Sequence, residues 1–386
     1  MCRGVKRAFL WGCLLPVLAA CAGGGESRGE GAIFPDPVPV EGQVRLSSIL
    51  SRYRLIPLQT SDSSLVGAVV KVVKNDGRYY VSDRSDQLSV FDAQGRFLGR
   101  IAGRGAGPGE YGRLLDFDVD DRQVVILDYQ RLHFYSLDGE YEKTVHMADN
   151  GTYVRLLSGG RILLASDSPQ GVVCLLERNG EDGRYFVERG QRHHFRKGFA
   201  FVQAGAEVLF QDGVCTNDVW CFGGKKEVQP GHLVDDSRAL GASEEESAVK
   251  EHGYPYLLQP NSALKIWRLT GSARHLAFLA LVDRQALWYV HDLSEKTTAV
   301  YDMTDGKAQI VDDITFNDQQ PCLFLSYANR SDDGFVAWTS MARLAEDLDK
   351  HSDSQETQTY RQAAALVARC VDPEEANPVL FDFDYK

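Results

Sequence analysis

The stretch "VVKVVKNDGRYYVSDRSDQLSVFDAQGRFLGRIA", residues 69–102, decides the fold. It contains four β-rich runs separated by Asn-Asp-Gly, Asp-Arg-Ser-Asp and Ala-Gln-Gly, which are turn-forming combinations. Residues 114–147, "LLDFDVDDRQVVILDYQRLHFYSLDGEYEKTVHM", repeat this pattern of β-rich runs and turns. Three kinds of residue recur 44 or 45 positions apart: Asp83 and Asp128, Phe91 and Tyr135, Gly95 and Gly139. The chain is therefore built from repeats.

Weaker copies follow in residues 161–188, 206–228, 273–303 and, as the start of a sixth, 320–341. Four strands per repeat of about 40 to 50 residues are the signature of a β-propeller. Residues 124–127 and 275–282 are apolar on both strand faces, as expected for inner strands that lie between neighbouring blades. No helix of ten or more residues separates the strands, which argues against a parallel α/β fold. We predict an all-β, six-bladed β-propeller with four-stranded blades.

The glycine-rich stretch "GRGAGPGEY", residues 103–111, lies between the fourth strand of one repeat and the first strand of the next. A phosphate-binding loop would need a helix after it, together with the P-loop or Rossmann spacing, and neither is present. We interpret four of its residues as turn formers that let the chain pass from the outer edge of a blade to the central axis: Gly105, Gly107, Pro108 and Gly109.

The amino terminus has the order of segments found in export signals. Arg3, Lys6 and Arg7 precede an apolar run that is too short for a membrane span, and the run ends at "LAAC", residues 18–21. This ending resembles the lipobox of bacterial lipoproteins, which implies cleavage before Cys21 and acylation of that residue. We predict a signal peptide over 1–20, a flexible lipidated tether over 21–43 and the propeller over 44–386.

The formal net charge is −12, and loss of the three basic residues of the signal makes it −12 − 3 = −15. Such an acidic chain is a poor partner for nucleic acid. Five of the eight cysteines lie beyond Cys21, an odd number without CxxC spacing, so neither a disulfide framework nor a zinc site is expected. Cys215 and Cys221 could bridge a hairpin, although burial as small apolar side chains is the preferred interpretation.

Residues 79–120 resemble NHL-type repeats, which share V-x-D, I-x-V-F-D-x-x-G and G-x-G-P-G-[EQ]-[FY] phrases. The chain as a whole resembles six-bladed propeller lipoproteins of gut Bacteroidota, through "YRLIPLQTSDSSLVGAV" (53–69) and "EEANPVLFDFDYK" (374–386). It departs from the NHL pattern at Arg113 and Leu114, where a proline is usual. The resemblance implies the fold, but that family has no established common activity.

Ring closure and two insertions can also be predicted. Residues 52–59 and 377–385 are both strand-like, and pairing them in one sheet would close the ring and remove an exposed edge. Residues 235–262 form a polar insertion after the fourth blade. Residues 341–370 are expected to form a helical insertion in the last blade, with an apolar stripe packed on one end of the propeller, formed by Ala363, Leu366, Val367 and Cys370.

Candidate chemistry is sparse. Asp83 and Asp128 could belong to a ring of carboxylates around a divalent cation in the channel, but we interpret them as acceptors of backbone hydrogen bonds in repeated turns. His193 and His194 are adjacent, so on a strand they would point to opposite faces, and we predict no metal site there. The second-to-third-strand turns and inter-blade loops should share one face of the ring. Their side chains form a candidate binding surface for an anion or glycan: Arg84, Arg104, Tyr111, Arg113, Tyr129, Arg131, His193 and Arg196.

The sequence therefore predicts a monomeric binding module for a glycan or protein, held at the outer membrane by its lipid and using no cofactor. The alternatives are a metal-dependent, lactonase-like hydrolase, a lyase of the streptogramin-lyase type, or a purely structural envelope protein. "CAGGGES" has only Glu26 near the lipidated residue, and this favours the periplasmic face over the cell surface.

Overall fold

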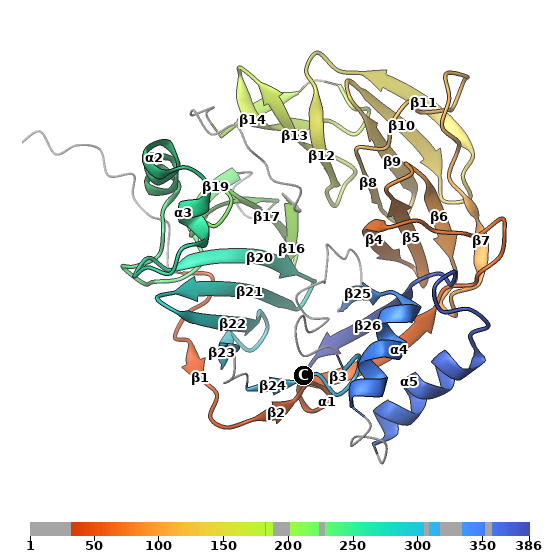
Figure 1. Ribbon diagram of the computed structural model, residues 1–386. Helices are drawn as coiled ribbons and strands as arrows, with labels where there is room; N and C mark the ends of the chain where they lie inside the picture. The colour runs from red at the N-terminus through yellow and green to blue at the C-terminus, as the bar shows by residue number, and fades with distance from the viewer. Residues whose placement is uncertain are drawn as a thin grey trace, which may run out of the picture.

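The computed structural model describes residues 32–181, 183–187, 201–223, 228–304, 309–316, 334–351 and 357–386. Its sheets stand around a common centre as the blades of a six-bladed β-propeller, which confirms the predicted fold (Figure 1). Blade one contains β4 (Val69–Asn75), β5 (Arg78–Asp83), β6 (Leu88–Phe91) and β7 (Phe97–Arg100). Blade two contains β8 (Asp116–Val119), β9 (Gln123–Asp128), β10 (Arg131–Ser136) and β11 (Tyr141–His146).

The next blades repeat this order with antiparallel neighbours. Blade three contains β12 (Gly151–Leu156), β13 (Ile162–Ser168), β14 (Gly171–Leu176) and β15 (Arg184–Phe186). Blade four contains β16 (Phe201–Ala204), β17 (Glu207–Gln211), β18 (Asp218–Phe222) and β19 (Val228–His232). Blade five contains β20 (Lys265–Gly271), β21 (His275–Val282), β22 (Gln285–Asp292) and β23 (Thr297–Asp302). Blade six contains β25 (Phe335–Thr339), β26 (Val379–Tyr385) and β3 (Leu50–Pro57) in its described part.

The hydrophobic core is divided among the seams between blades. Six clusters of buried side chains each join one pair of neighbouring blades. Phe117 of blade two, for example, packs in one cluster with Val73 of blade one. Strand β9 is fully buried from Val124 to Leu127, as its unbroken apolar sequence predicts. Each blade is therefore stabilised by both of its neighbours.

The first and last regions of the chain pair in one sheet, as predicted. Strand β3 runs antiparallel to β26, from the pair Pro57 and Val379 to the pair Leu50 and Tyr385. Strand β26 also pairs with β25, so the amino-terminal strand becomes the outer strand of the last blade. This pairing closes the ring across the longest separation in sequence.

A buried carboxylate reinforces that closure. Asp382 of β26 has no exposed surface, and its Oδ2 accepts hydrogen bonds from Arg54 (2.7 Å), Tyr79 (2.9 Å) and Arg52 (3.1 Å). The Lys74 ammonium lies 3.3 Å from the same oxygen. Burial alone would raise the pKa of Asp382, but the hydrogen bond from Arg54 and the charges of Lys74 and Arg52 lower it below its usual value. Blade six is thereby tied to blade one.

We expect Asp382→Asn to lower the free energy of unfolding by about 3 kcal/mol at neutral pH, because it removes the buried carboxylate that the Lys74 ammonium and the Arg52 and Arg54 guanidinium groups contact. Denaturant titration measures this loss. A carboxylate with a depressed native pKa stabilises the fold above the ordinary Asp pKa of about 4, and this contribution is lost as the pH falls through the native value. The difference between wild type and variant should therefore shrink in acid.

Asp121→Asn is the matched control, because that carboxylate is 82% exposed and lies 3.8 Å from its partner, Arg122. The control should change stability by less than about 0.5 kcal/mol. Equal stability of Asp382→Asn and the control at neutral pH would contradict a structural role for the buried carboxylate.

The predicted helical insertion is present as two helices, α4 (Met341–Lys350) and α5 (Gln358–Arg369), between β25 and β26. Leu344, Leu348 and Ala363 are buried in one cluster with Phe316 and Val379 of the propeller. Of the predicted apolar stripe, Ala363 is fully buried, and Leu366, Val367 and Cys370 pack against the same cluster partly buried, so the stripe faces the ring as expected. Ser340 and Thr357 cap the two helices by accepting hydrogen bonds from backbone N–H groups in the first turns.

The polar insertion after blade four also contains helices, α2 (Ala242–His252) and α3 (Pro255–Leu258), which were not predicted. Glu245 of α2 accepts hydrogen bonds from the backbone N–H groups of Val214 (2.9 Å) and Cys215 (2.8 Å). Leu257 is buried against Cys215 and Leu240. The insertion is therefore fastened to the edge of blade four and forms a continuous surface with it.

The predicted tether is too long at its carboxyl-terminal end. Phe34 is only 1% exposed and its ring lies 4.6 Å from that of Phe278, in the seam between blades four and five. Strand β1 (Val38–Pro39) pairs with β23, and β2 (Val44–Arg45) pairs with β24 (Ile310–Val311), followed by α1 (Leu46–Ile49). The chain thus joins the propeller about ten residues before the predicted boundary at 44, because an aromatic side chain fills the seam.

Candidate functional site

One face of the ring, which we call the loop face, carries the second-to-third-strand turns and the inter-blade loops. Antiparallel neighbours in each blade place these connections at the same end of the strands. The helices α2 and α3 belong to an inter-blade loop. The helices α4 and α5 connect β25 to β26, the third and second strands counted from the outer strand β3, and this connection corresponds to the second-to-third-strand turn of the other blades. Both insertions therefore lie on this face (Figure 1). The six sequence-predicted candidate residues that the structure describes lie there too.

The glycine-rich loop is closed by its own hydrogen bonds. Tyr111 N donates to Gly103 O (3.2 Å), Gly105 N donates to Tyr111 O (3.0 Å), and Gly107 N donates to Glu110 Oε2 (2.8 Å). Gly109 has φ of +76°, and a Cβ there would lie 2.8 Å from the Tyr141 ring. The loop leads directly into β8, without a helix, as a chain turn would.

Asp83 and Asp128 fasten the loops in equivalent ways. Asp83 accepts hydrogen bonds from the backbone N–H groups of Gly67 (2.8 Å) and Ser85 (2.9 Å). Asp128 accepts one from Gly112 N (2.9 Å), also sixteen residues earlier, and one from the Arg131 guanidinium. Each carboxylate therefore ties the loop that enters its blade to the turn that leaves its second strand.

The predicted binding residues divide into three groups. Arg84, Arg104 and Arg113 are exposed, and we call them the arginine patch. Tyr129 is 51% exposed, whereas Tyr111 is 1% exposed and donates from its hydroxyl to Asp86 O (2.9 Å). Arg131 is half-buried and paired with Asp128. His193 and Arg196 fall outside the described ranges.

Tyr111 is thus a structural residue of the glycine-rich loop, and burial raises its pKa to about 12. Its hydroxyl holds the turn after β5 against the loop, and this brings Arg84 to the same region as Arg104 and Arg113. Within the described ranges, no carboxylate is in ion-pair contact with the three arginines. The Arg104 Nε donates to the backbone oxygen of Gly112 (3.2 Å). The patch therefore presents three exposed guanidinium groups that form no ion pair with a carboxylate of the described residues.

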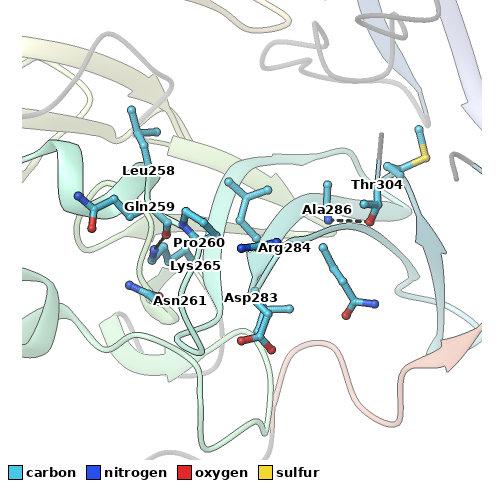
Figure 2. Close-up of a pocket in the computed structure, with 13 residues that line it drawn as sticks. Leu258, Gln259, Pro260, Asn261, Lys265, Asp283, Arg284, Ala286 and Thr304 are labelled. Carbon is cyan, nitrogen blue, oxygen red and sulfur yellow. Dashed lines mark hydrogen bonds between the residues drawn. The ribbon is translucent and has the colours of Figure 1, made fainter. Parts of the chain in front are cut away.

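A pocket of about 260 Å³ lies on the loop face of blade five, and we call it the blade-five pocket. Figure 2 shows that its lining comes from three segments: the end of the first insertion with Lys265, the β21–β22 turn, and the residues after β23. The backbone N–H of Asp283 donates to Asn261 O (2.6 Å), which joins the turn to the insertion. The backbone N–H of Ala286 donates to Thr304 Oγ1 (3.2 Å) on the third segment.

Lys265 is the most unusual residue of this pocket. It is 2% exposed, and its ammonium donates to the backbone oxygens of Gln259 (2.6 Å) and Tyr256 (3.4 Å) while lying 5.5 Å from the Tyr256 ring centroid. Burial lowers the pKa of Lys265, partly offset by the neighbouring Cys215. No carboxylate of the described residues forms an ion pair with it.

Asn261 supplies a second unmatched group. Its Oδ1 accepts a hydrogen bond from Ala263 N (3.2 Å), which assigns the amide orientation. Its Nδ2 is buried and has no hydrogen-bond partner among the residues that the structure describes. Arg284 lies exposed at the rim in the β21–β22 turn, next to Asp283.

Sequence reasoning missed this site because its parts are separated along the chain. The one signal in the sequence was a lysine, Lys265, within the apolar run "ALKIW".

The opposite face has a polar cluster around the carboxyl terminus. His275 Nδ1 lies 3.4 Å from Asp384 Oδ1, and its Nε2 lies 3.5 Å from Asp292 Oδ2 and 3.2 Å from Lys386 O. Burial raises the pKa of Asp292, but hydrogen bonds from Ser294 and Arg274 and the N–H of Glu295 lower it well below its usual range. The cluster holds the end of the chain against blade five.

Within the part of the chain that the structure describes, no group of three or more His, Cys, Asp or Glu side chains is placed to hold a metal ion. Four described cysteines are free thiols, Cys174, Cys215, Cys221 and Cys370, so Cys215 and Cys221 do not pair. Burial raises the pKa of the Cys221 thiol to about 12, as expected for an inert apolar residue. None of the described helices has both the length and the apolar character that a membrane span requires.

Comparison with known proteins places the chain in a family. A family model described as a domain of unknown function, DUF4934, matches residues 36–381. The chain belongs to the DUF4934 family. A crystal structure of a Bacteroides fragilis protein that is described as exported is similar to this DUF4934 chain, with 18% identity, a TM-score of 0.69, and coverage of 91% of this chain and 99% of that one. At this identity the likeness shows the fold alone.

Two other solved structures are more distant. BamB from Moraxella catarrhalis has 15% identity and a TM-score of 0.35, and it covers 66% of this DUF4934 chain and 68% of its own. The Pan2 WD40 domain of Neurospora crassa has 13% identity and a TM-score of 0.36, with 60% and 64% coverage. No curated protein matches the chain.

Proposed function

We propose that this protein is an exported, lipid-anchored envelope protein whose propeller binds an anionic ligand on the loop face. Export is supported by the predicted signal before Cys21 and by the description of the similar B. fragilis protein as exported. The lipid would hold the domain at the outer membrane, and the residues between Cys21 and Ile33 would act as a flexible linker between the membrane and the propeller. The sparse acidic residues after Cys21 favour the periplasmic side.

The observation that carries the binding role is the arginine patch. Three exposed arginines lie on neighbouring loops of a chain whose formal net charge is −12, and none of the three forms an ion pair with a carboxylate of the described residues. Positive charge in such a location concentrates anions at one place, and guanidinium groups form paired hydrogen bonds with carboxylates and sulfates. Both helical insertions border the same face and enlarge the surface available to a polymer such as an acidic glycan.

The lipid anchor predicts the location of the protein in fractionated cells. Wild type should sediment with membranes and resist a high-salt wash, because acyl chains hold it independently of charge. Cys21→Ala should move to the soluble envelope fraction. Cys13→Ala, which changes a residue of the removed signal, should behave as wild type. Membrane association of Cys21→Ala equal to that of wild type would contradict lipid anchoring.

The arginine patch predicts charge-selective binding. The full-length protein, purified in detergent, should bind dextran sulfate but not neutral dextran, with an affinity that falls as salt is raised. The triple variant Arg84→Gln, Arg104→Gln and Arg113→Gln should weaken binding by at least about tenfold, corresponding to about 1.4 kcal/mol. Calorimetry or affinity electrophoresis gives the comparison.

A second triple variant controls for the loss of net charge alone. Arg96→Gln, Arg122→Gln and Arg178→Gln remove three exposed arginines at connections on the opposite face. This variant should retain most of the binding. Equal weakening by the two triple variants, or equal binding of the sulfated and neutral polymers, would contradict a ligand site on the loop face.

A further inference from the structure

The blade-five pocket holds a buried cation, Lys265, that has no counterion in the described part of the chain. The Lys265 ammonium is satisfied only by two backbone carbonyl groups and one aromatic ring among the described residues. Carbonyl groups solvate a cation but do not neutralise it, and an unneutralised buried charge is unfavourable. A ligand that brings one negative charge into this pocket would relieve that cost.

An unpartnered donor lies in the same pocket. The Asn261 amide is oriented by the hydrogen bond that its Oδ1 accepts from Ala263 N, so its buried Nδ2 is left with two N–H groups and no acceptor. Buried donors in native proteins are usually paired, which makes this one a candidate for a ligand oxygen. The Lys265 ammonium and the Asn261 Nδ2 would therefore both be satisfied by one negatively charged hydrogen-bond acceptor.

The charges at the rim indicate how much negative charge the pocket accommodates. Arg284 is exposed without a described ion pair, and the Asp283 carboxylate stands next to it in the turn. Lys265 and Arg284 contribute two positive charges and Asp283 one negative charge, so the pocket has a net charge of +1. This balance favours a carboxylate over a doubly charged phosphate.

The remaining lining matches a small hydroxylated molecule. Leu258, Pro260 and Met303 supply apolar surface, and Gln285 and Thr304 supply polar groups. A cavity of about 260 Å³ is slightly smaller than the roughly 300 to 1,000 Å³ of pockets for drug-sized ligands, so a ligand of one small ring is favoured. We propose that the blade-five pocket binds the carboxylate of a uronic acid, with Lys265 and Asn261 holding the carboxylate and Arg284 closing the rim.

This inference rests on the proposed function, since it assigns a carboxylated sugar unit to a binding site on the loop face. The pocket and the arginine patch are nevertheless formed by different blades, so each can be disabled separately. The pocket would take one monomeric unit, whereas the patch would hold the charged chain to which that unit belongs.

The test is calorimetric titration of the full-length protein in detergent with glucuronate and, in parallel, with glucose. These two sugars differ only by a carboxylate in place of a hydroxymethyl group. Glucuronate should bind at least about tenfold more tightly than glucose, and its affinity should fall as salt increases. Equal affinity for the two sugars, or no binding of millimolar glucuronate, would overturn the proposal.

Asn261→Asp is the decisive variant because it keeps the acceptor for Ala263 N and replaces only the unpartnered donor with a negative charge. It should weaken glucuronate binding by at least about tenfold, and the exposed Arg284→Gln by about threefold or more. Arg122→Gln on the opposite face should have no effect. Unchanged binding by Asn261→Asp, with its fold verified by circular dichroism and thermal unfolding, would also overturn the proposal.

The two proposals fail in different ways. If dextran sulfate binding depends on the arginine patch while glucuronate does not bind, the loop-face function stands and the uronate pocket is wrong. If Asn261→Asp loses glucuronate binding while the triple arginine variant binds dextran sulfate as wild type does, the pocket stands and the patch assignment is wrong.

Discussion

The pairing of β3 with β26 is the contact on which the whole ring depends. Each blade buries its two faces against its neighbours, so a ring that opens at one seam exposes apolar surface on two blades at once. The closing strand comes from the beginning of the chain and the partner strand from its end. Asp382 adds a buried ionic network across the closing seam, and this network fixes the register through hydrogen-bond geometry as well as charge.

Closure leaves the loops free to differ. The apolar side chains of the strands are buried in the seams between blades. The connections at the strand ends therefore only have to span the distance from one strand to the next. Asp83 and Asp128 fix two of these connections, because each carboxylate accepts a hydrogen bond from the loop that enters its blade and thereby holds that loop against a turn. The loop face can therefore carry helices, a glycine-rich corner and a pocket on a rigid frame, which is the arrangement expected of a binding surface.

Much of this architecture could be predicted from the sequence because it repeats. The recurrence of Asp83 and Asp128, and the apolar run at 124–127, reflect constraints that every blade shares. The closing strands were predictable because a propeller ring closes most simply when a strand from the beginning of the chain pairs with one from its end. The features that escaped prediction occur once: Phe34 fills a seam from within a Pro- and Gly-rich segment, and Tyr111 is buried by a turn that its own hydroxyl holds in place.

The blade-five pocket could not be predicted for a related reason. Lys265 and Asn261 lie near each other in sequence, but their relation to Arg284 depends on where the insertion sits against blade five. The helices α2 and α3 belong to a segment rich in Glu and Ser, whose polar composition hides the few apolar contacts, such as Leu257, that fasten it. Long-range packing of a unique segment leaves little periodic signal in the sequence.

Native-state hydrogen exchange of the full-length protein tests ring closure most directly. If β3 is an integral strand of the last blade, its hydrogen-bonded amides should exchange only through global unfolding, with the same opening free energy as those of β26. Exchange of the β3 amides at a clearly lower opening free energy, while β25 and β26 remain protected, would contradict the account, because it would show that the ring stands without its closing strand.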